Sequence, residues 1–370
     1  MPIYIDFHKL EGNPTEEDIR LAHQADLAKQ EEFSVRFHQY WFNEEASTVF
    51  CLIEGPSPEA VKTCHWSTHG NTPCNIQEVE PVYLKLFLGE EAPVDQHMML
   101  TLEGKTDPAN RTILLTDIRR TDATENKYYL VPIKPKNLVV DAIAKFNGRF
   151  VEYTNEEKIV GVFDSPINAI RCAKNIREAI ERLRKKHEES SEWKIDYRIA
   201  LNNGQPLTEN DGFFEAAIRQ ANRLCMITQP NQIIMTAQLK ELLQMETEAS
   251  LYPSTLASAR VLTGPEVVFI DSLFTIIEQN LRADSLSVAK LSYLIGLSRP
   301  QFYRKVMALT GKSPQVFIKD FRMNKAWHLL RSKKWNISEV SFEVGFSSPS
   351  YFSKIFHEQY GYVPSELQTA

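Results

Sequence analysis

The pattern of hydrophobic and polar positions first alternates between short apolar runs and amphipathic stretches. It predicts strands at 2–7, 35–42, 48–54 and 75–82, and helices at 15–32 and from Pro58 onward. Asn13 and Pro14 precede the first helix as a capping residue and a first-turn proline. The order strand, helix, strand, strand, helix, strand predicts a ferredoxin-like α/β sandwich over residues 1–87.

The same alternation returns after residues 88–110, a stretch with glycines and prolines that we expect to link two domains. The predicted elements are strands at 112–118, 149–153, 158–163, 194–201 and 231–236, and helices at 136–146, 166–187 and 212–226. They predict a second ferredoxin-like α/β sandwich domain over residues 108–248. Residues 245–268 look like the next connection.

From residue 271 onward the apolar period is helical throughout, and the pattern repeats. Gly296 recurs 49 residues later as Gly345, and Phe302 recurs 50 residues later as Phe352. Each copy consists of an amphipathic helix, a glycine at a sharp bend and a second amphipathic helix. This is helix-turn-helix geometry, so residues 268–370 are predicted to form an all-α double helix-turn-helix domain.

The length of 370 residues suits a multidomain α+β and all-α chain of this kind. Hydrophobic residues make up 43% and charged residues 24%, which excludes a disordered or fibrous protein. No apolar run approaches the roughly 20 residues that span a bilayer, and the chain opens on a strand rather than on a cleavable leader. Five cysteines, an odd number, favour reduced thiols. We therefore expect a cytoplasmic protein with no membrane partner.

The net charge of −6 is unevenly distributed along the chain. Residues 1–90 carry 6 basic and 15 acidic groups, whereas residues 271–370 carry 13 basic and 8 acidic groups. Because attraction to phosphate depends on the local field, the basic end predicts a polyanionic partner for the helix-turn-helix region.

The C-terminal residues resemble the DNA-binding domain of the AraC/XylS family of transcription factors. The resemblance is carried by Gly311-Lys312-Ser313-Pro314, Ile337-Ser338-Glu339-Val340, Gly345-Phe346-Ser347-Ser348 and Gly361-Tyr362-Val363-Pro364. It implies that double-stranded DNA is the partner and that the second helix of each copy lies in a major groove. Outward position and resemblance together give eight candidate DNA-binding residues: Arg299, Pro300, Tyr303, Arg304, Pro349, Ser350, Ser353 and Lys354. Among them, Arg304 is the candidate for a bidentate guanine contact.

The middle region resembles the catalytic domain of class III nucleotidyl cyclases, through residues 112–118, 148–151, 162–166 and 221–225. Such an enzyme holds two metal ions with two carboxylates. Asp117 stands at the first carboxylate position, but the second position falls at 153–157, where no Gly-Asp pair occurs. Arg219 replaces the family's asparagine, while Arg223 matches its arginine. We therefore expect a cyclase fold that is not an enzyme and that pairs two subunits into a homodimer.

In the N-terminal region, His23 and Asp26 share one helix face, and His65 and His69 share a face of the other helix. Imidazoles on one face can jointly bind nickel or zinc, and His38 and Cys51 on the intervening strands could complete the site. The region also resembles a family of small ferredoxin-like nickel-binding proteins, through residues 22–27, 50–56 and 65–70. Without a metal, the same pocket could accept a small organic effector.

Three functions are compatible with these patterns. The favoured one is a sequence-specific, dimeric transcriptional regulator that senses a metal ion or a small molecule through its N-terminal domain. The alternatives are an active nucleotidyl cyclase fused to a DNA-binding domain, and a metal-binding storage protein with a DNA-binding tail. No cofactor other than a nickel or zinc ion is predicted.

Overall fold

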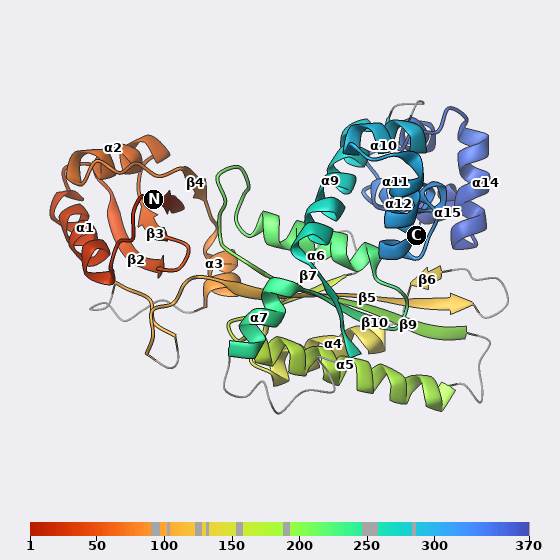
Figure 1. Cartoon of the computed structure of the whole chain (residues 1–370), viewed down its shortest axis with the longest axis horizontal. Helices are drawn as coiled ribbons and strands as arrows, with labels where there is room; N and C mark the ends of the chain where they lie inside the picture. Colours follow the sequence, from red (N-terminus) through yellow and green to blue (C-terminus); the bar gives the residue numbers. More distant parts are fainter. Residues whose placement is uncertain are drawn as a thin grey trace. The chain divides into compact units, whose positions relative to one another are not determined.

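The computed structural model describes most of the chain: residues 1–89, 97–101, 104–122, 128–130, 133–152, 158–187, 193–245, 258–282 and 286–369. The chain divides into two compact units (Figure 1). The first unit contains residues 1–113, 162–165 and 203–219, and the second contains residues 114–161, 166–202 and 220–370.

The first unit contains a four-stranded antiparallel sheet of strand order β2-β3-β1-β4. Its elements are β1 (Ile3–Lys9), α1 (Glu16–Lys29), β2 (Arg36–Asn43), β3 (Thr48–Glu54), α2 (Pro58–Thr68) and β4 (Asn75–Glu78). Thr15 and Asp18 form a capping box that starts α1, and the Ser57 side chain caps α2 ahead of Pro58. The strand order is ferredoxin-like, so the predicted fold of this region is confirmed.

The end of this domain differs from the sequence prediction. The predicted strand at 75–82 ends at Glu78, and Pro81 opens a helix, α3 (Pro81–Leu88). Proline has no amide hydrogen to donate in a sheet, whereas its fixed φ suits the first turn of a helix. Part of the predicted linker then returns to the sheet, where the Tyr40 amide donates to the His97 carbonyl at 2.8 Å.

The predicted linker also ends in a buried ion pair. Arg111 is 2% exposed, and its guanidinium donates to both carboxylate oxygens of Asp107, at 3.0 and 2.8 Å. It also donates to the carbonyl of Phe87 at 2.9 Å and pairs with Asp164 at 2.8 Å. A buried guanidinium is stable when its donors are matched in this way, so residues 107–111 belong to the packed first unit.

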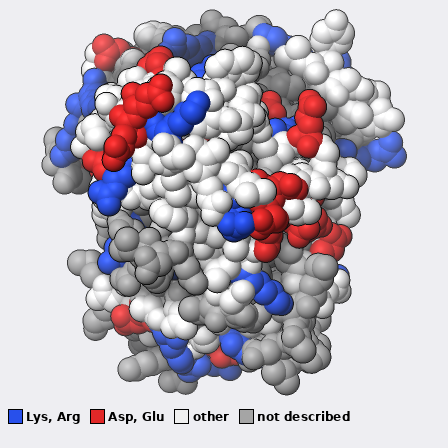
Figure 2. Space-filling view, turned by 90° about the vertical axis from the view of Figure 1, so that its left-hand side faces the viewer, with Lys and Arg blue, Asp and Glu red and all other residues white. Residues whose placement is uncertain are grey.

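Acidic and basic side chains both reach the face of the molecule that Figure 2 shows. In the view of Figure 2, acidic side chains lie in several groups, with basic side chains between and beside them. The 15 acidic groups of residues 1–90 outnumber the 6 basic ones. Two of the acidic groups, Asp6 and Asp26, are buried instead.

The middle region forms a seven-stranded sheet of order β11-β10-β9-β5-β8-β7, with β6 paired to β5. The strands are β5 (Arg111–Asp122), β6 (Tyr128–Leu130), β7 (Arg149–Glu152), β8 (Ile159–Phe163), β9 (Trp193–Gly204), β10 (Gln232–Thr236) and β11 (Arg260–Leu262). The helices are α4 (Ile133–Lys145), α5 (Pro166–His187), α6 (Glu215–Ile227) and α7 (Ala237–Met245). The inner order β9-β5-β8-β7 is again ferredoxin-like, which confirms the second predicted sandwich. Strand β11 lies within the stretch predicted as a connection, and adds to β10 in parallel.

The C-terminal region is all-helical, as predicted. Its helices are α9 (Gly264–Asn280), α10 (Val288–Ile295), α11 (Arg299–Thr310), α12 (Pro314–Arg331), α13 (Ile337–Glu343), α14 (Pro349–Tyr360) and α15 (Pro364–Thr369). The capping box of Thr263 and Glu266 starts α9 earlier than the helical period predicted. Phe302 and Phe352, which the repeat matched to each other, are both fully buried. The two helix-turn-helix motifs are α10 with α11 and α13 with α14.

The two bend glycines differ in their surroundings and give a matched test. Gly296 and Gly345 have left-handed φ values of +76° and +82°. A Cβ at Gly296 would meet nothing within 4 Å, whereas one at Gly345 would overlap the Leu281 carbonyl and approach the Arg322 guanidinium. We expect Gly296→Ala to destabilise its motif by about 1–2 kcal/mol through backbone strain. Gly345→Ala should lose about 1–3 kcal/mol more through overpacking.

Native-state hydrogen exchange of amides in α10 and α13 of the full chain measures the two losses separately. Equal losses at the two glycines would contradict the role given to the close approach of Leu281.

Candidate functional site

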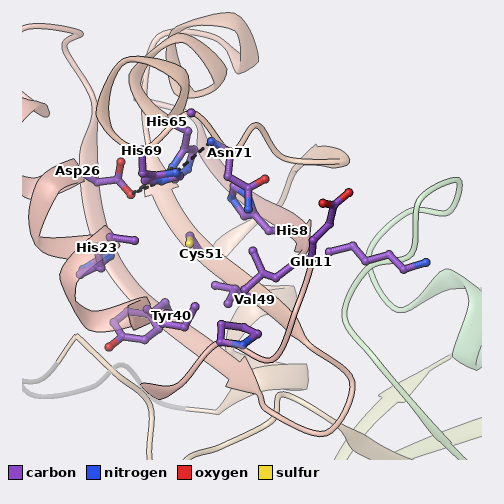
Figure 3. Close-up of a pocket in the computed structure, with 16 residues that line it drawn as sticks. His8, Glu11, His23, Asp26, Tyr40, Val49, Cys51, His65, His69 and Asn71 are labelled. Carbon is purple, nitrogen blue, oxygen red and sulfur yellow. Dashed lines mark hydrogen bonds and ion pairs between the residues drawn. The ribbon is translucent and has the colours of Figure 1, made fainter. Parts of the chain in front are cut away.

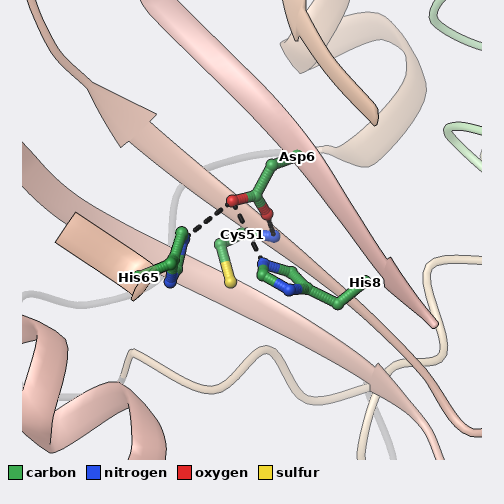
Figure 4. A group of neighbouring side chains, drawn as sticks. All are labelled: Asp6, His8, Cys51 and His65. Atoms are coloured by element: carbon green, nitrogen blue, oxygen red, sulfur yellow. Dashed lines mark hydrogen bonds and ion pairs between the residues drawn. The ribbon is translucent and has the colours of Figure 1, made fainter. Parts of the chain in front are cut away.

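One face of the N-terminal sheet carries polar side chains in its buried interior. Asp6 and His8 lie at alternate positions of β1, so both point toward the same face of the sheet. Asp6 is paired in register with Cys51 of β3, whose backbone amide donates to Asp6 Oδ1 at 3.0 Å. Figure 4 shows Asp6, His8 and Cys51 together with His65. All four are no more than 5% exposed.

His65 of α2 lies between two carboxylates. Its Nε2 is 2.8 Å from Asp6 Oδ2, and its Nδ1 is 3.2 Å from Asp26 Oδ2. His69, one turn later, places its Nε2 3.3 Å from the same Asp26 oxygen (Figure 3). Thr68 donates its hydroxyl to Asp26 Oδ1 at 2.5 Å, and His8 Nε2 lies 3.3 Å from Asp6 Oδ2.

The charges of this network depend on one another. Burial by itself raises the pKa values of Asp6 and Asp26, but the charges and hydrogen bonds of the neighbouring histidines hold both well below their usual range. Burial lowers the pKa of His65, but the two carboxylates outweigh it and raise that pKa to about 10. Without a metal, His65 is therefore an imidazolium between two carboxylates near neutral pH.

Two groups of side chains in the described part of the chain have donor atoms close enough to share a metal ion. They are Asp6, His8, Cys51 and His65, and Asp26, His65 and His69, with the donor atoms of each group within 4.8 Å of one another. The first group offers one oxygen, two nitrogens and one sulfur. This donor set and number suit a four-coordinate, borderline-soft ion such as zinc.

His65 belongs to both groups, but each of its ring nitrogens faces a different one. If Nε2 binds a metal together with Asp6, His8 and Cys51, then Nδ1–H remains directed at Asp26 Oδ2. A carboxylate behind a metal-bound histidine orients the ring and makes it a stronger ligand. This arrangement gives Asp26 a supporting role and makes the four-donor group the better metal centre.

Protonation of the thiol sets a condition on this site. Burial raises the pKa of Cys51 well above its usual value, and the charges of Asp6 and Asp26 raise it further. The thiolate therefore forms when a cation is present to balance it, because a metal ion displaces the thiol proton. Binding would also displace the proton that His65 holds at Nε2.

Four of the six predicted ligands lie in these groups, namely Asp26, Cys51, His65 and His69. These four residues line a cavity of about 590 Å³. His23 lines that cavity too but lies outside both groups. Its ring packs against Tyr40 with the centroids 4.7 Å apart, and neither ring nitrogen has a hydrogen-bond partner among the described residues. Burial, aided by His97, lowers the pKa of His23 to about 4, so the ring is neutral.

His38 does not approach the other predicted ligands. A bulge in β2 between Phe37 and Gln39 takes His38 out of the regular alternation of the strand. It lines a separate cavity of about 420 Å³ with Trp41 and Leu52, and its Nε2 lies 3.6 Å from Glu54.

The sequence prediction omitted Asp6 and His8. Helical spacing of histidines does not indicate Asp6 and His8, because both residues lie on a strand. The available signal was two polar residues, Asp6 and His8, at alternate positions at the end of the apolar run that begins at Ile3.

The predicted DNA-binding residues lie at the N-terminal ends of α11 and α14. Six of the eight are exposed: Arg299, Pro300, Tyr303, Arg304, Ser350 and Lys354. Pro349 and Ser353 are half-buried, and the Ser353 hydroxyl donates to the Pro349 carbonyl at 2.9 Å. Both helices thus present a polar first half to the surroundings.

The candidate cyclase carboxylate has a protein partner. Arg119 Nε donates to both oxygens of Asp117, at 2.8 and 3.0 Å, and a guanidinium nitrogen of Arg198 lies 4.0 Å away. Burial by itself raises the pKa of Asp117, but Arg119, Arg198 and Lys158 hold it well below its usual range. Residues 153–157, where the second carboxylate was predicted to be missing, lie outside the described residues.

The two other cyclase positions lie on α6. Arg219 pairs with Asp211 at 2.8 Å and is 3.7 Å from Glu215. Arg223, one turn later, is directed at α9, where it donates to the carboxylates of Asp271 and Glu278 at 3.1 and 3.0 Å. The guanidinium groups of both arginines are thus engaged with protein carboxylates.

Within the part of the chain that the structure describes, no helix combines the length and apolarity required to cross a bilayer.

Two family models match the chain. Residues 4–79 match the model described as "Nickel responsive protein SCO4226-like", and residues 291–370 match a model described as "Helix-turn-helix domain". A curated relative, Histidine kinase P4 of Formosa agariphila, is 39% identical over 95 residues. The matched segment covers 26% of this chain and only 7% of that protein.

Solved structures match each region. SCO4226 from Streptomyces coelicolor A3(2) is 38% identical and matches 21% of this chain and 94% of its own, with a TM-score of 0.20. An AraC-type transcriptional regulator from Chromobacterium violaceum is 25% identical. The match covers 28% of this chain and 90% of that protein, with a TM-score of 0.26. An adenylate/guanylate cyclase/hydrolase from Silicibacter pomeroyi is 24% identical. The match covers 36% of this chain and 79% of that protein, with a TM-score of 0.28.

The family models bear out the resemblances at the two ends of the chain: residues 4–79 match the SCO4226-like model, and residues 291–370 match a helix-turn-helix model. The middle region has the ferredoxin-like strand order that was predicted for it.

The raised pKa of His65 predicts how stability changes with pH when no metal is bound. A histidine whose pKa rises on folding from about 6.5 to about 10 stabilises the fold fully below the lower value, and this contribution is lost as pH rises through the upper one. We expect the free energy of unfolding of the N-terminal domain to fall between pH 7 and 10.

Hydrogen exchange of β1 and β3 amides in metal-free full chain, corrected for intrinsic exchange rates, measures this change. His65→Gln should lower stability by about 3–5 kcal/mol at pH 6.5, because two buried carboxylates lose their cation, and should remove most of the pH dependence. An unchanged pH profile in that variant would show that another group titrates.

Proposed function

We propose that this protein is a metal-responsive transcriptional regulator. The N-terminal centre binds a transition-metal ion, nickel being the first candidate, and the bound ion alters how the AraC-type domain binds its operator. The observation that carries the proposal is the buried group Asp6, His8, Cys51 and His65, in the same chain as that domain.

The donor chemistry supports a metal as the signal. Imidazole and thiolate ligands suit nickel and zinc, and all four side chains are removed from water. A bound ion would supply the positive charge that the imidazolium of His65 otherwise supplies, and would thus replace protons on His65 and Cys51. Because two protons would leave as one divalent ion enters, the net charge of the domain interior would stay the same, and metal–ligand bonds would replace the bonds of those protons.

The AraC-type domain supplies the DNA contact. Arg299, Pro300, Tyr303 and Arg304 of α11, with Pro349, Ser350, Ser353 and Lys354 of α14, are the residues we assign to the major-groove surface. Their support is their exposure and their place in the N-terminal halves of the two helices. Arg304 carries a guanidinium, whose two donors can contact the O6 and N7 atoms of a guanine together.

The middle region is a catalytically silent scaffold that pairs two subunits in a homodimer. The lack of catalytic activity is supported by the Asp117–Arg119 pair, because Arg119 donates to both carboxylate oxygens that a catalytic metal ion would need. The absence of a Gly-Asp pair at 153–157 in the sequence argues in the same direction. A dimer would present two copies of the double motif to DNA, as operator symmetry commonly requires.

We expect the isolated chain to bind nickel or zinc and to change its operator affinity by at least about fivefold when it does. The operator is selected in vitro from genomic fragments with the full chain, and affinity is measured by fluorescence anisotropy with each metal and with a chelator. Cys51→Ser should weaken metal binding by more than about tenfold. Cys74→Ser is the matched control, because that thiol is exposed and outside both donor groups.

If the operator affinity is the same with nickel, with zinc and with a chelator, the metal-response part of the proposal is wrong. Equal effects of the two cysteine variants would place the metal elsewhere.

We expect no cyclic nucleotide from ATP or GTP with Mn²⁺ above a protein-free background. The reason is that Asp117 is neutralised by Arg119 rather than by a metal ion. A chromatographic product assay with an active cyclase as the positive control measures this. Cyclic nucleotide whose formation is abolished by Asp117→Ala would establish an enzyme instead.

A further inference from the structure

Arg223, which matches the arginine of the cyclases, is buried against the first helix of the C-terminal region. It is 7% exposed, and its guanidinium donates to Asp271, Thr275 and Glu278, at 3.1, 3.1 and 3.0 Å. These three acceptors lie on α9. Charge-assisted hydrogen bonds of this kind are the stronger ones in proteins, particularly when they are shielded from water.

The guanidinium also lies over an aromatic ring at the core of the DNA-binding domain. Its carbon atom is 5.8 Å from the centre of the fully buried Phe274 ring. Phe274 in turn packs against Phe317 and Phe321 of α12, with ring centroids 5.5 and 5.6 Å away. Arg223 therefore contacts the core on which the two helix-turn-helix motifs are assembled.

A second contact joins the middle region to the end of α11. Arg260 of β11 donates to the carbonyls of Leu309 and Ala308 at 2.7 and 3.2 Å, and the Gln229 amide donates to the carbonyl of Thr310. The last carbonyls of a helix have no partner inside it, and a cation there interacts favourably with the helix dipole. The C-terminal end of α11 is thus capped by the middle region.

The C-terminal end of α14, the second helix assigned to DNA, also lies near the middle region. Ile355, Gln359 and Tyr360 of α14 line a cavity of about 370 Å³ together with Asp117 and Arg119. The last turn of α11 contacts the middle region, and residues within 355–360 of α14 line a cavity with it, whereas six of the eight residues assigned to DNA lie exposed in the N-terminal halves of these helices. The contacts therefore hold the helices without covering the surface that reads bases.

We infer that Arg223 is a positioning residue for DNA reading. Together with Arg260 and Gln229 it holds α9 and the end of α11 on the middle region, and so sets the orientation of the first motif relative to the second. An arginine that serves a cyclase in catalysis here serves to align a DNA-binding domain. The inference rests on the proposed function in that operator DNA is the ligand whose binding responds.

The Arg223 contacts affect specific and non-specific DNA binding differently. Specific binding needs both reading helices in register with their grooves at the same time. Non-specific binding depends on basic charge near phosphates, which the loss of a buried arginine leaves in place. Loss of the Arg223 contacts should therefore weaken operator binding far more than binding to random DNA.

The test uses the full chain and the operator selected with it. We expect Arg223→Ala to weaken operator binding by about tenfold and to change binding to random DNA by less than about twofold. Arg223→Lys should recover part of the loss, because it keeps the charge but not the fork of donors. Hydrogen exchange should rise in α9 and in the last turn of α11.

Arg219→Ala is the matched control, since Arg219 lies one turn earlier on α6 and pairs with Asp211 and Glu215. It should leave operator binding unchanged. In a double-mutant cycle, Arg223→Ala and Glu278→Ala should be less than additive, because both remove the same ion pair.

Operator affinity that stays within about twofold in Arg223→Ala, while exchange in α9 rises, would overturn the inference. So would equal losses on operator and random DNA. If Arg223→Ala does not fold, the variant Asp271→Asn with Glu278→Gln keeps the arginine and removes its charged partners; unchanged operator binding in that variant would also overturn it. Failure to select any operator with the unaltered chain would instead reject the proposed function.

Discussion

A carboxylate buried in a protein must be matched by a positive charge, and the N-terminal domain is organised around two such carboxylates. Asp6 stands on the central strand β1 and Asp26 on α1, and His65 reaches both from α2. The packing of both helices against the sheet is thus tied to one imidazolium. Its removal would leave two charges in a medium of low dielectric constant, which is among the more damaging changes a core can undergo.

The same requirement bears on the metal binding proposed for this site. The cation between Asp6 and Asp26 is supplied by the proton of His65, and the neighbouring His8 and Cys51 are further ligands at the same place. A metal ion can take over the positive charge while the carboxylates keep their positions. One imidazolium with two carboxylates carries a net charge of about −1, and one divalent ion with two carboxylates and a thiolate would carry the same, so the two states would differ in the protons on His65 and Cys51.

Charge matching also accounts for the middle region. In a metal-dependent cyclase, carboxylates and arginines at these positions must be available to ions and nucleotide. Here Asp117 is held by Arg119, and Arg223 is held by Asp271 and Glu278. Both groups therefore have internal partners, Asp117 within the sheet and Arg223 on α9.

The sequence by itself determined the main elements of both ferredoxin-like sheets and the repeated helix-turn-helix, but not α3, β6, α7 or β11. These features depend on local periodicity, capping residues and short motifs, which can be read without knowledge of distant contacts. Helical spacing likewise found His65, His69 and Asp26. The limits of local patterns are visible at Pro81, where a helix replaces the second half of a predicted strand.

Only the tertiary structure decided which side chains meet. Asp6, Cys51 and His65 are far apart in the sequence. Strand pairing places Asp6 beside Cys51, and the contact of α2 with the sheet brings His65 to Asp6. A single bulge in β2 removes His38 from the site, while the regular alternation of β1 brings in His8. The partners of Arg223 are likewise decided by the packing of α9 against α6. Register, bulges and helix packing are collective properties of the folded chain, and a change of one position in a strand reverses the face to which a side chain points.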